Sequence, residues 1–119
     1  MIKKACEHRI KYETNLKDGN GTIKFINFFE EGESNNVGRL FGMTTIPVGG
    51  SIGYHKHTGD NEVFYFIKGT AKVNDNGNEV ILRPGDSMVC FDGNSHSIEN
   101  NGDCDLEFIA LILYTEQKK

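Results

Sequence analysis

Short segments rich in apolar, β-branched and aromatic residues alternate with polar, glycine-containing stretches along the whole chain. Segments of this kind at regular spacing are typical of β-strands joined by turns. No window shows a sustained helical period, so at most a short helix is expected, near residues 11–18. The pattern predicts strands at residues 22–29, 39–46, 52–57, 62–67, 70–73, 79–82, 87–91, 96–99 and 105–114. The sequence therefore predicts an all-β sandwich or barrel.

The final predicted strand is apolar on both of its faces. Leu106, Phe108 and Ala110 share one parity, while Ile109 and Leu111 share the other. One set can fill a barrel, but the second would expose an apolar patch larger than soluble monomers usually carry. The early strand at residues 22–29 repeats this two-sided pattern. We therefore expect a homodimer in which a second copy covers the outer set.

Length and charge narrow the class of protein. The chain has 119 residues, without a repeat, a linker or a low-complexity segment, which predicts a single domain over residues 1–119. Its formal charge of −4 gives no electrostatic reason to expect nucleic acid or an anionic membrane as a partner. No apolar run approaches the roughly 20 residues of a membrane helix, and the N-terminal residues lack a signal-peptide pattern.

The cysteines indicate the redox environment. Cys6, Cys90 and Cys104 are an odd number of cysteines without the spacing of a CxxC motif. Such cysteines are typical of reduced thiols rather than of a disulfide framework. The expected location is the cytoplasm.

Three histidines and one glutamate lie in the middle of the β-pattern. His55 and His57 are two residues apart, so both rings project from one face of a strand. Glu62 follows beyond a tight turn, where an antiparallel neighbour would bring its carboxylate beside the rings, and His96 begins a later strand. Imidazole and carboxylate ligands suit iron, manganese, nickel, zinc or copper better than calcium. We expect one divalent transition metal per chain, with open positions for water or a small-molecule ligand.

Two glycine-framed stretches resemble the two sequence motifs of the cupin superfamily. Residues 49–69 match the first motif through Gly49, His55, His57, Glu62 and Gly69. Residues 85–100 match the second through Gly85, Gly93, His96 and Asn100. Phe91 departs from it by replacing a usual proline, which shapes a loop and is not a ligand. The resemblance implies a small single-domain cupin, that is, a double-stranded β-helix or jelly-roll barrel, with metal ligands at His55, His57, Glu62 and His96.

The resemblance leaves the reaction open, because cupins with this ligand set include dioxygenases, decarboxylases, isomerases and proteins that only bind a ligand. The favoured hypothesis is a metal-dependent enzyme acting on a small oxygen-rich molecule such as a carboxylate, an enol or a sugar derivative. The alternative is a binding or sensing module without turnover. A sugar-nucleotide epimerase is disfavoured because those relatives work without metal.

Several other residues have an expected place. Phe64 and Phe66 share parity with Glu62 and should line the barrel below the metal. Gly53 is expected to keep space open beside the metal. Cys90 should be a buried, unreactive thiol rather than a further ligand. His8, outside both motifs, is expected at the surface.

The polar residues near the motifs are harder to place. Arg39 is expected to point outward, because arginine is rarely buried without a partner, although an inward guanidinium would bind a carboxylate. The second acid that many reactions need has four candidates. They are Asp60, Tyr54, Tyr65 and Glu99. Strand parity turns Tyr54 and Tyr65 away from the histidines.

Overall fold

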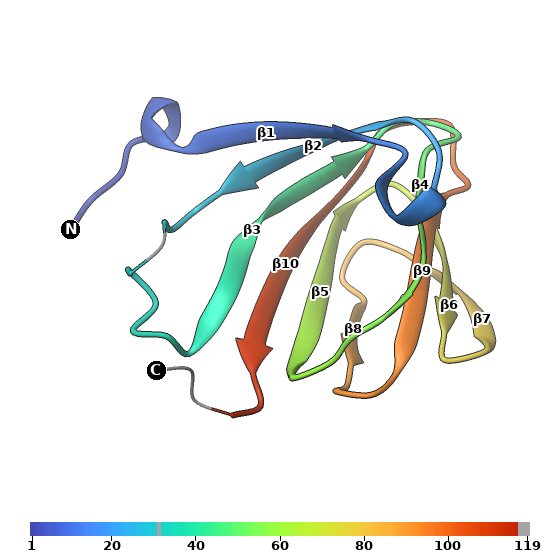
Figure 1. The fold of residues 1–119 in the computed structure, drawn as a ribbon. Coiled ribbons are helices and arrows are strands. Elements are labelled where there is room, and N and C mark those ends of the chain that lie inside the picture. Colours follow the sequence, from blue (N-terminus) through green and yellow to red (C-terminus); the bar gives the residue numbers. More distant parts are fainter. Residues whose placement is uncertain (31, 117–119) are drawn as a thin grey trace.

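Two antiparallel β-sheets face each other in the computed structural model, which describes residues 1–30 and 32–116 (Figure 1). One sheet has six strands in the order β1-β2-β3-β10-β5-β8, and the other has four in the order β4-β9-β6-β7. The strands are β1 (Arg9–Thr14), β2 (Thr22–Asn27), β3 (Gly38–Ile46), β4 (Ser51–Lys56), β5 (Asp60–Lys68), β6 (Ala71–Asp75), β7 (Asn78–Leu82), β8 (Ser87–Cys90), β9 (Ser95–Asn100) and β10 (Leu106–Tyr114). Two short 3₁₀ helices, η1 (Ala5–Glu7) and η2 (Leu16–Asp18), flank β1.

The core fills the space between the two sheets. In β10, buried and less buried residues alternate from Leu106 to Ile112, as they do in β5 from Asp60 to Phe66. Phe66, Phe108 and Ile46 are fully buried there. Because strand side chains alternate between the two faces, one parity of each strand forms this core. The predicted all-β architecture is confirmed, and Phe64 and Phe66 line the barrel interior as expected.

The expectation for residues 11–18 holds in part, because the short 3₁₀ helix η2 lies at their end, but the sequence pattern does not predict the strand β1 before it. These residues contain most of β1, which pairs with β2 from Arg9 opposite Asn27 to Thr14 opposite Thr22, and then the 3₁₀ turn η2. The inward positions of β1 are Arg9, Lys11 and Glu13, which line a cavity instead of packing into the core. A strand whose inner face is charged lacks the apolar alternation by which strands are recognised.

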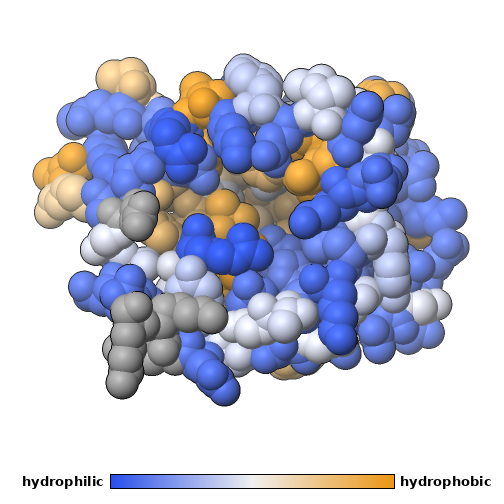
Figure 2. All heavy atoms as spheres, in the orientation of Figure 1, coloured by the Kyte–Doolittle hydropathy of each residue, from blue (hydrophilic) through white to orange (hydrophobic). Residues whose placement is uncertain are grey.

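None of the helices in the described part of the chain has the length and apolar content needed to cross a membrane. Figure 2 shows a mainly hydrophilic surface around a recess in which hydrophobic atoms are visible.

Candidate metal centre

The four predicted ligand residues come together at one end of the space between the sheets. His55 lies on β4 directly opposite His96 on β9, His57 follows the end of β4, and Glu62 comes from β5 in the other sheet. The register of β4 and β9 shifts between Ile52 and His55. One potential ligand atom from each of the four residues lies within 4.8 Å of all the others. The four residues therefore come together as predicted, but Glu62 reaches the histidines from the opposite sheet and not from a strand paired with β4.

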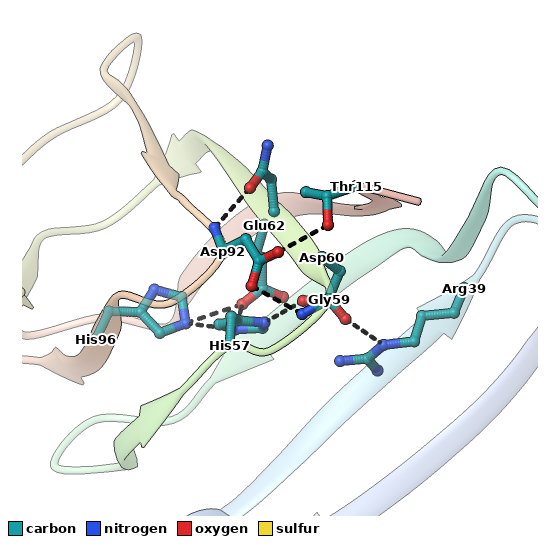
Figure 3. Close-up of polar contacts among 9 residues, drawn as sticks. Arg39, His57, Gly59, Asp60, Glu62, Asp92, His96 and Thr115 are labelled. Carbon is teal, nitrogen blue, oxygen red and sulfur yellow. Dashed lines mark hydrogen bonds and ion pairs between the residues drawn. The ribbon is translucent and has the colours of Figure 1, made fainter. Parts of the chain in front are cut away.

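Three of these ligand atoms form a nearly equilateral triangle. Nε2 of His57 and Nε2 of His96 each lie 3.0 Å from Oε1 of Glu62, and the two nitrogens lie 3.1 Å apart (Figure 3). Adjacent ligands at right angles around a metal, each about 2.1 Å from it, are separated by about 3 Å. The triangle matches that spacing, so these residues fit one face of a transition-metal coordination shell.

Two of the histidine rings are held by a hydrogen bond at Nδ1, which leaves their Nε2 atoms available for a metal. Nδ1 of His57 lies 2.7 Å from Oδ1 of Asp60, and Nδ1 of His55 lies 2.7 Å from the carbonyl oxygen of Gly53. A carboxylate or carbonyl acceptor on the second ring nitrogen is the usual arrangement for metal-binding histidines, since it fixes the tautomer. The ring of His96 stacks on Phe64 instead, and its buried Nδ1 has no partner among the described residues.

The site concentrates negative potential. Burial acts to raise the pKa of Glu62, but hydrogen bonds from His57 and His96 outweigh it and lower the pKa to about 2. The hydrogen bond with Glu62 raises the pKa of His57 against the effect of burial, and Asp60 adds to the rise. Burial lowers the pKa of His55. A carboxylate that stays ionised beside imidazole lone pairs attracts a cation.

A cavity of about 610 Å³ opens above the four residues. Its inner wall is apolar and includes Phe64, Phe108 and Ile98. Positively charged side chains gather among its lining residues, in contrast to the net charge of −4 of the whole chain. These side chains are Arg9, Lys11, Lys17, Arg39 and Lys56. Such a lining favours an anionic ligand.

The candidates for a second acid separate clearly. Tyr54 and Tyr65 are 52% and 51% exposed and point away from the histidines, as strand parity predicts. Glu99 is exposed on β9. Asp60 is the one of the four that lines the cavity, and both of its carboxylate oxygens are engaged, by His57 and Arg39.

The expectation for Arg39 is wrong. Its neighbour Phe41 faces outward, but Nε of Arg39 donates a hydrogen bond to Oδ2 of Asp60 at 3.0 Å, and the side chain lines the cavity. The register of β3 against β10 shifts here, since Leu40 lies opposite Ile112 and Gly38 opposite Leu113. Arg39 is thus an extra residue on β3, and such bulges redirect a side chain relative to simple alternation.

The explanation for Gly53 also changes. A Cβ atom at this position would overlap the backbone carbonyl of Lys17 in η2. Glycine is needed there for the close approach of η2 to β4, rather than to keep space beside the metal. Cys90 is fully buried, and burial raises its thiol pKa to about 11, which agrees with an unreactive thiol. His8 is partly buried and packs against Phe28.

Hydrogen bonds of Asp92, a residue that the sequence pattern does not single out, hold the turn carrying His57. The Asp92 carboxylate accepts hydrogen bonds from the backbone N–H of Gly59 and the hydroxyl of Thr115, both at 2.8 Å (Figure 3). The backbone N–H of Asp92 donates to Oδ1 of Asn61 at 2.7 Å. The β4–β5 turn is thereby tied to the β8–β9 turn.

Comparison with known proteins agrees with this arrangement. The sequence family described as the cupin domain matches residues 42–112. This chain belongs to the cupin family. The oxalate-binding protein of Thermotoga maritima is 37% identical to this cupin over 115 residues, which cover 95% of this chain and 93% of that protein.

Solved structures show that the fold is the double-stranded β-helix of the cupins. The crystal structure of a predicted oxalate decarboxylase from Thermotoga maritima has a TM-score of 0.90 and 35% identity, covering 96% of this cupin and 99% of that chain. Protein TT1209 of Thermus thermophilus has a TM-score of 0.71 and 18% identity, covering 95% and 96% of the two chains, and therefore shares the fold alone.

Proposed function

We propose that this cupin binds one divalent transition-metal ion through His55, His57, Glu62 and His96, and uses it to bind a small carboxylate such as oxalate. The triangle of ligand atoms separated by 3.0–3.1 Å carries this proposal. The metal is one of iron, manganese, nickel, zinc or copper, since mixed imidazole and carboxylate ligands suit these ions. The name of the Thermotoga maritima oxalate-binding protein supports the choice of ligand.

The residues of the cavity have separate roles in this function. When bound, the metal would supply a Lewis acid that takes and polarises carboxylate oxygens. The positively charged side chains of the cavity lining attract the anion and raise its local concentration. The apolar wall around Phe64 and Phe108 excludes water from the far side of the ligand. Asp60 holds the ring of His57 in its ligating orientation.

Turnover of the bound carboxylate, by a decarboxylase, an oxygenase or an isomerase, is the second candidate function. The number of ligand residues favours it, because four protein ligands would leave room on a six-coordinate metal for a substrate and a further small molecule to bind together. Binding without turnover is favoured by Asp60, since both of its oxygens are already engaged and neither is a free acid or base.

The test is to measure metal content and oxalate binding in the purified protein. We expect about one metal ion per chain and oxalate binding that disappears in the His96→Ala variant. The matched control is His8→Ala, which removes a histidine outside the site and should keep both properties. A wild-type protein that neither contains nor takes up a transition metal would refute the metal site. Oxalate recovered unchanged supports a binding protein, whereas its consumption supports an enzyme.

We also propose that the chain is a single-domain, cytoplasmic homodimer. The three cysteines are unpaired, with Cys6 exposed, Cys90 buried and Cys104 partly buried, which suits a reducing compartment. The outer face of the six-stranded sheet is the expected dimer interface, because its apolar residues are exposed in one copy.

A further inference from the structure

The volume of the cavity that Arg39 lines is larger than a ligand as small as oxalate requires. A cavity of about 610 Å³ falls within the range of about 300–1,000 Å³ that accommodates much larger ligands. Oxalate has only two carbons, and its two carboxylates can both bind the metal. The cavity therefore has room for a ligand that extends away from the metal, and Arg39 is part of its lining.

Asp60 holds Arg39 in a position to bind an anion. Nε of Arg39 donates a hydrogen bond to Oδ2 of Asp60 at 3.0 Å. Within residues 1–30 and 32–116, the guanidinium makes no other hydrogen bond. Asp60 is 5% exposed, whereas the Arg39 side chain is 50% exposed. A guanidinium has five N–H donors, so four on the two Nη atoms remain for a ligand. Those atoms form the planar fork that binds a carboxylate in a bidentate manner.

The same aspartate connects Arg39 to the metal centre. Oδ1 of Asp60 lies 2.7 Å from Nδ1 of His57, so one buried carboxylate orients both a metal ligand and the guanidinium (Figure 3). The other positively charged residues of the cavity lack this arrangement. Arg9 and Lys11 pair with Glu30 and Glu13, and none of these four side chains is buried.

We propose that Arg39 is a second anchor in the cavity, and that the preferred ligand is a dicarboxylate longer than oxalate. One end of such a ligand, a carboxylate with an oxygen on the next carbon, chelates the metal. Its distant carboxylate binds the Nη atoms of Arg39. This inference rests on the proposed metal-dependent binding of carboxylates and specifies its substrate class. Malate has these groups, whereas lactate has the same chelating end without the second carboxylate.

Calorimetric titration of the metal-loaded protein with malate, lactate and oxalate tests the proposal. We expect malate to bind at least tenfold more tightly than lactate, since a charge-assisted bidentate pair contributes at least that much. Arg39→Gln should remove most of this preference by weakening malate binding much more than lactate binding, and Arg39→Lys should keep part of it. Lys56→Gln is the matched control, because it removes another positive charge from the cavity lining and should keep the preference for malate.

The titrations distinguish a failure of the second anchor from a failure of the proposed function. If lactate or oxalate binds but malate binds no more tightly than lactate, the second anchor is refuted and the proposed function stands. If Arg39→Gln weakens lactate and malate equally, Arg39 acts through Asp60 and His57, and the anchor is again refuted. Metal titration of the same variant checks that case directly. If none of the three binds the metal-loaded protein, the proposed function itself fails.

Discussion

At the scale of single residues, the site depends on where the protons of its histidines lie. Asp60 accepts a hydrogen bond from Nδ1 of His57, which leaves Nε2 as a lone pair facing Glu62 and His96. A metal ion and a proton compete for that lone pair. The hydrogen bond with Glu62 raises the pKa of His57, with a further contribution from Asp60, so the proton competes strongly.

The pH dependence of metal binding follows from this competition. Because the pKa of His57 is raised, its proton is bound at pH values up to and above the usual histidine pKa of about 6.5. We expect the apparent metal affinity to decline as pH falls through that raised pKa, starting above about pH 6.5. In Asp60→Asn the decline should start at a lower pH, because the charge that favours the protonated ring is gone. Competition titrations with a metal chelator between about pH 5 and 8 measure both profiles.

An affinity that stays constant over this range would contradict histidine ligation. A decline that starts at the same pH in the wild type and in Asp60→Asn would show that Asp60 does not influence the His57 proton. Asp103→Asn is the control, since Asp103 is an exposed aspartate in another turn.

At the scale of elements, two turns hold the metal ligands in register. His57 exchanges backbone hydrogen bonds with the β8–β9 turn, donating to the carbonyl of Asn94 at 2.9 Å and accepting from Gly93 at 2.8 Å. The Asp92 carboxylate adds the contacts to Gly59 and Thr115. These bonds lower the pKa of Asp92, which shows that they favour its ionised form.

We expect Asp92→Ala to weaken metal binding by about tenfold, although Asp92 does not reach the metal, because residues that orient ligands commonly contribute about 10–100-fold. Asp86→Ala is the matched control, since Asp86 makes a comparable backbone contact in a different turn, to Arg83. Isothermal titration with the metal measures both variants. Equal affinity in Asp92→Ala and the wild type would mean that the backbone bonds of His57 suffice to hold the turn.

At this scale, the sequence predicts the ligand cluster better than it predicts the places of Arg39 and Gly53. The spacing of the four residues predicts that they come together, but it does not predict that Glu62 reaches the histidines from the other sheet, which depends on the whole fold. Strand alternation does not predict the direction of the Arg39 side chain, because a shift in register between β3 and β10 redirects that side chain. Strand alternation does not explain Gly53 either, because this glycine is needed for its contact with the backbone of η2, which depends on tertiary structure.

At the scale of the whole molecule, the outer face of the six-stranded sheet is apolar across several strands. One row of directly paired residues crosses the five strands β1, β2, β3, β10 and β5 in their order in the sheet. It consists of Ile10, Ile26, Met43, Ile109 and Tyr65. A second row on the same face is displaced from the first by two residues and crosses β3, β10, β5 and β8. It consists of Phe41, Leu111, Val63 and Val89. Two adjacent rows on one face form a continuous apolar surface of the kind that usually marks an interface.

We expect this surface to be the interface of a homodimer, burying more than about 1,000 Å² in total. Tyr65→Glu places a charge in the middle of the face and should convert the dimer into a folded monomer, because an unpaired charge is costly to bury. Tyr54→Glu is the matched control, since Tyr54 is 52% exposed against 51% for Tyr65 but lies on β4 of the other sheet. Light scattering gives the mass, and circular dichroism verifies the fold. A wild-type mass of one chain at micromolar concentration would show that no second copy covers the sheet, and a dimeric Tyr65→Glu variant would place the interface elsewhere.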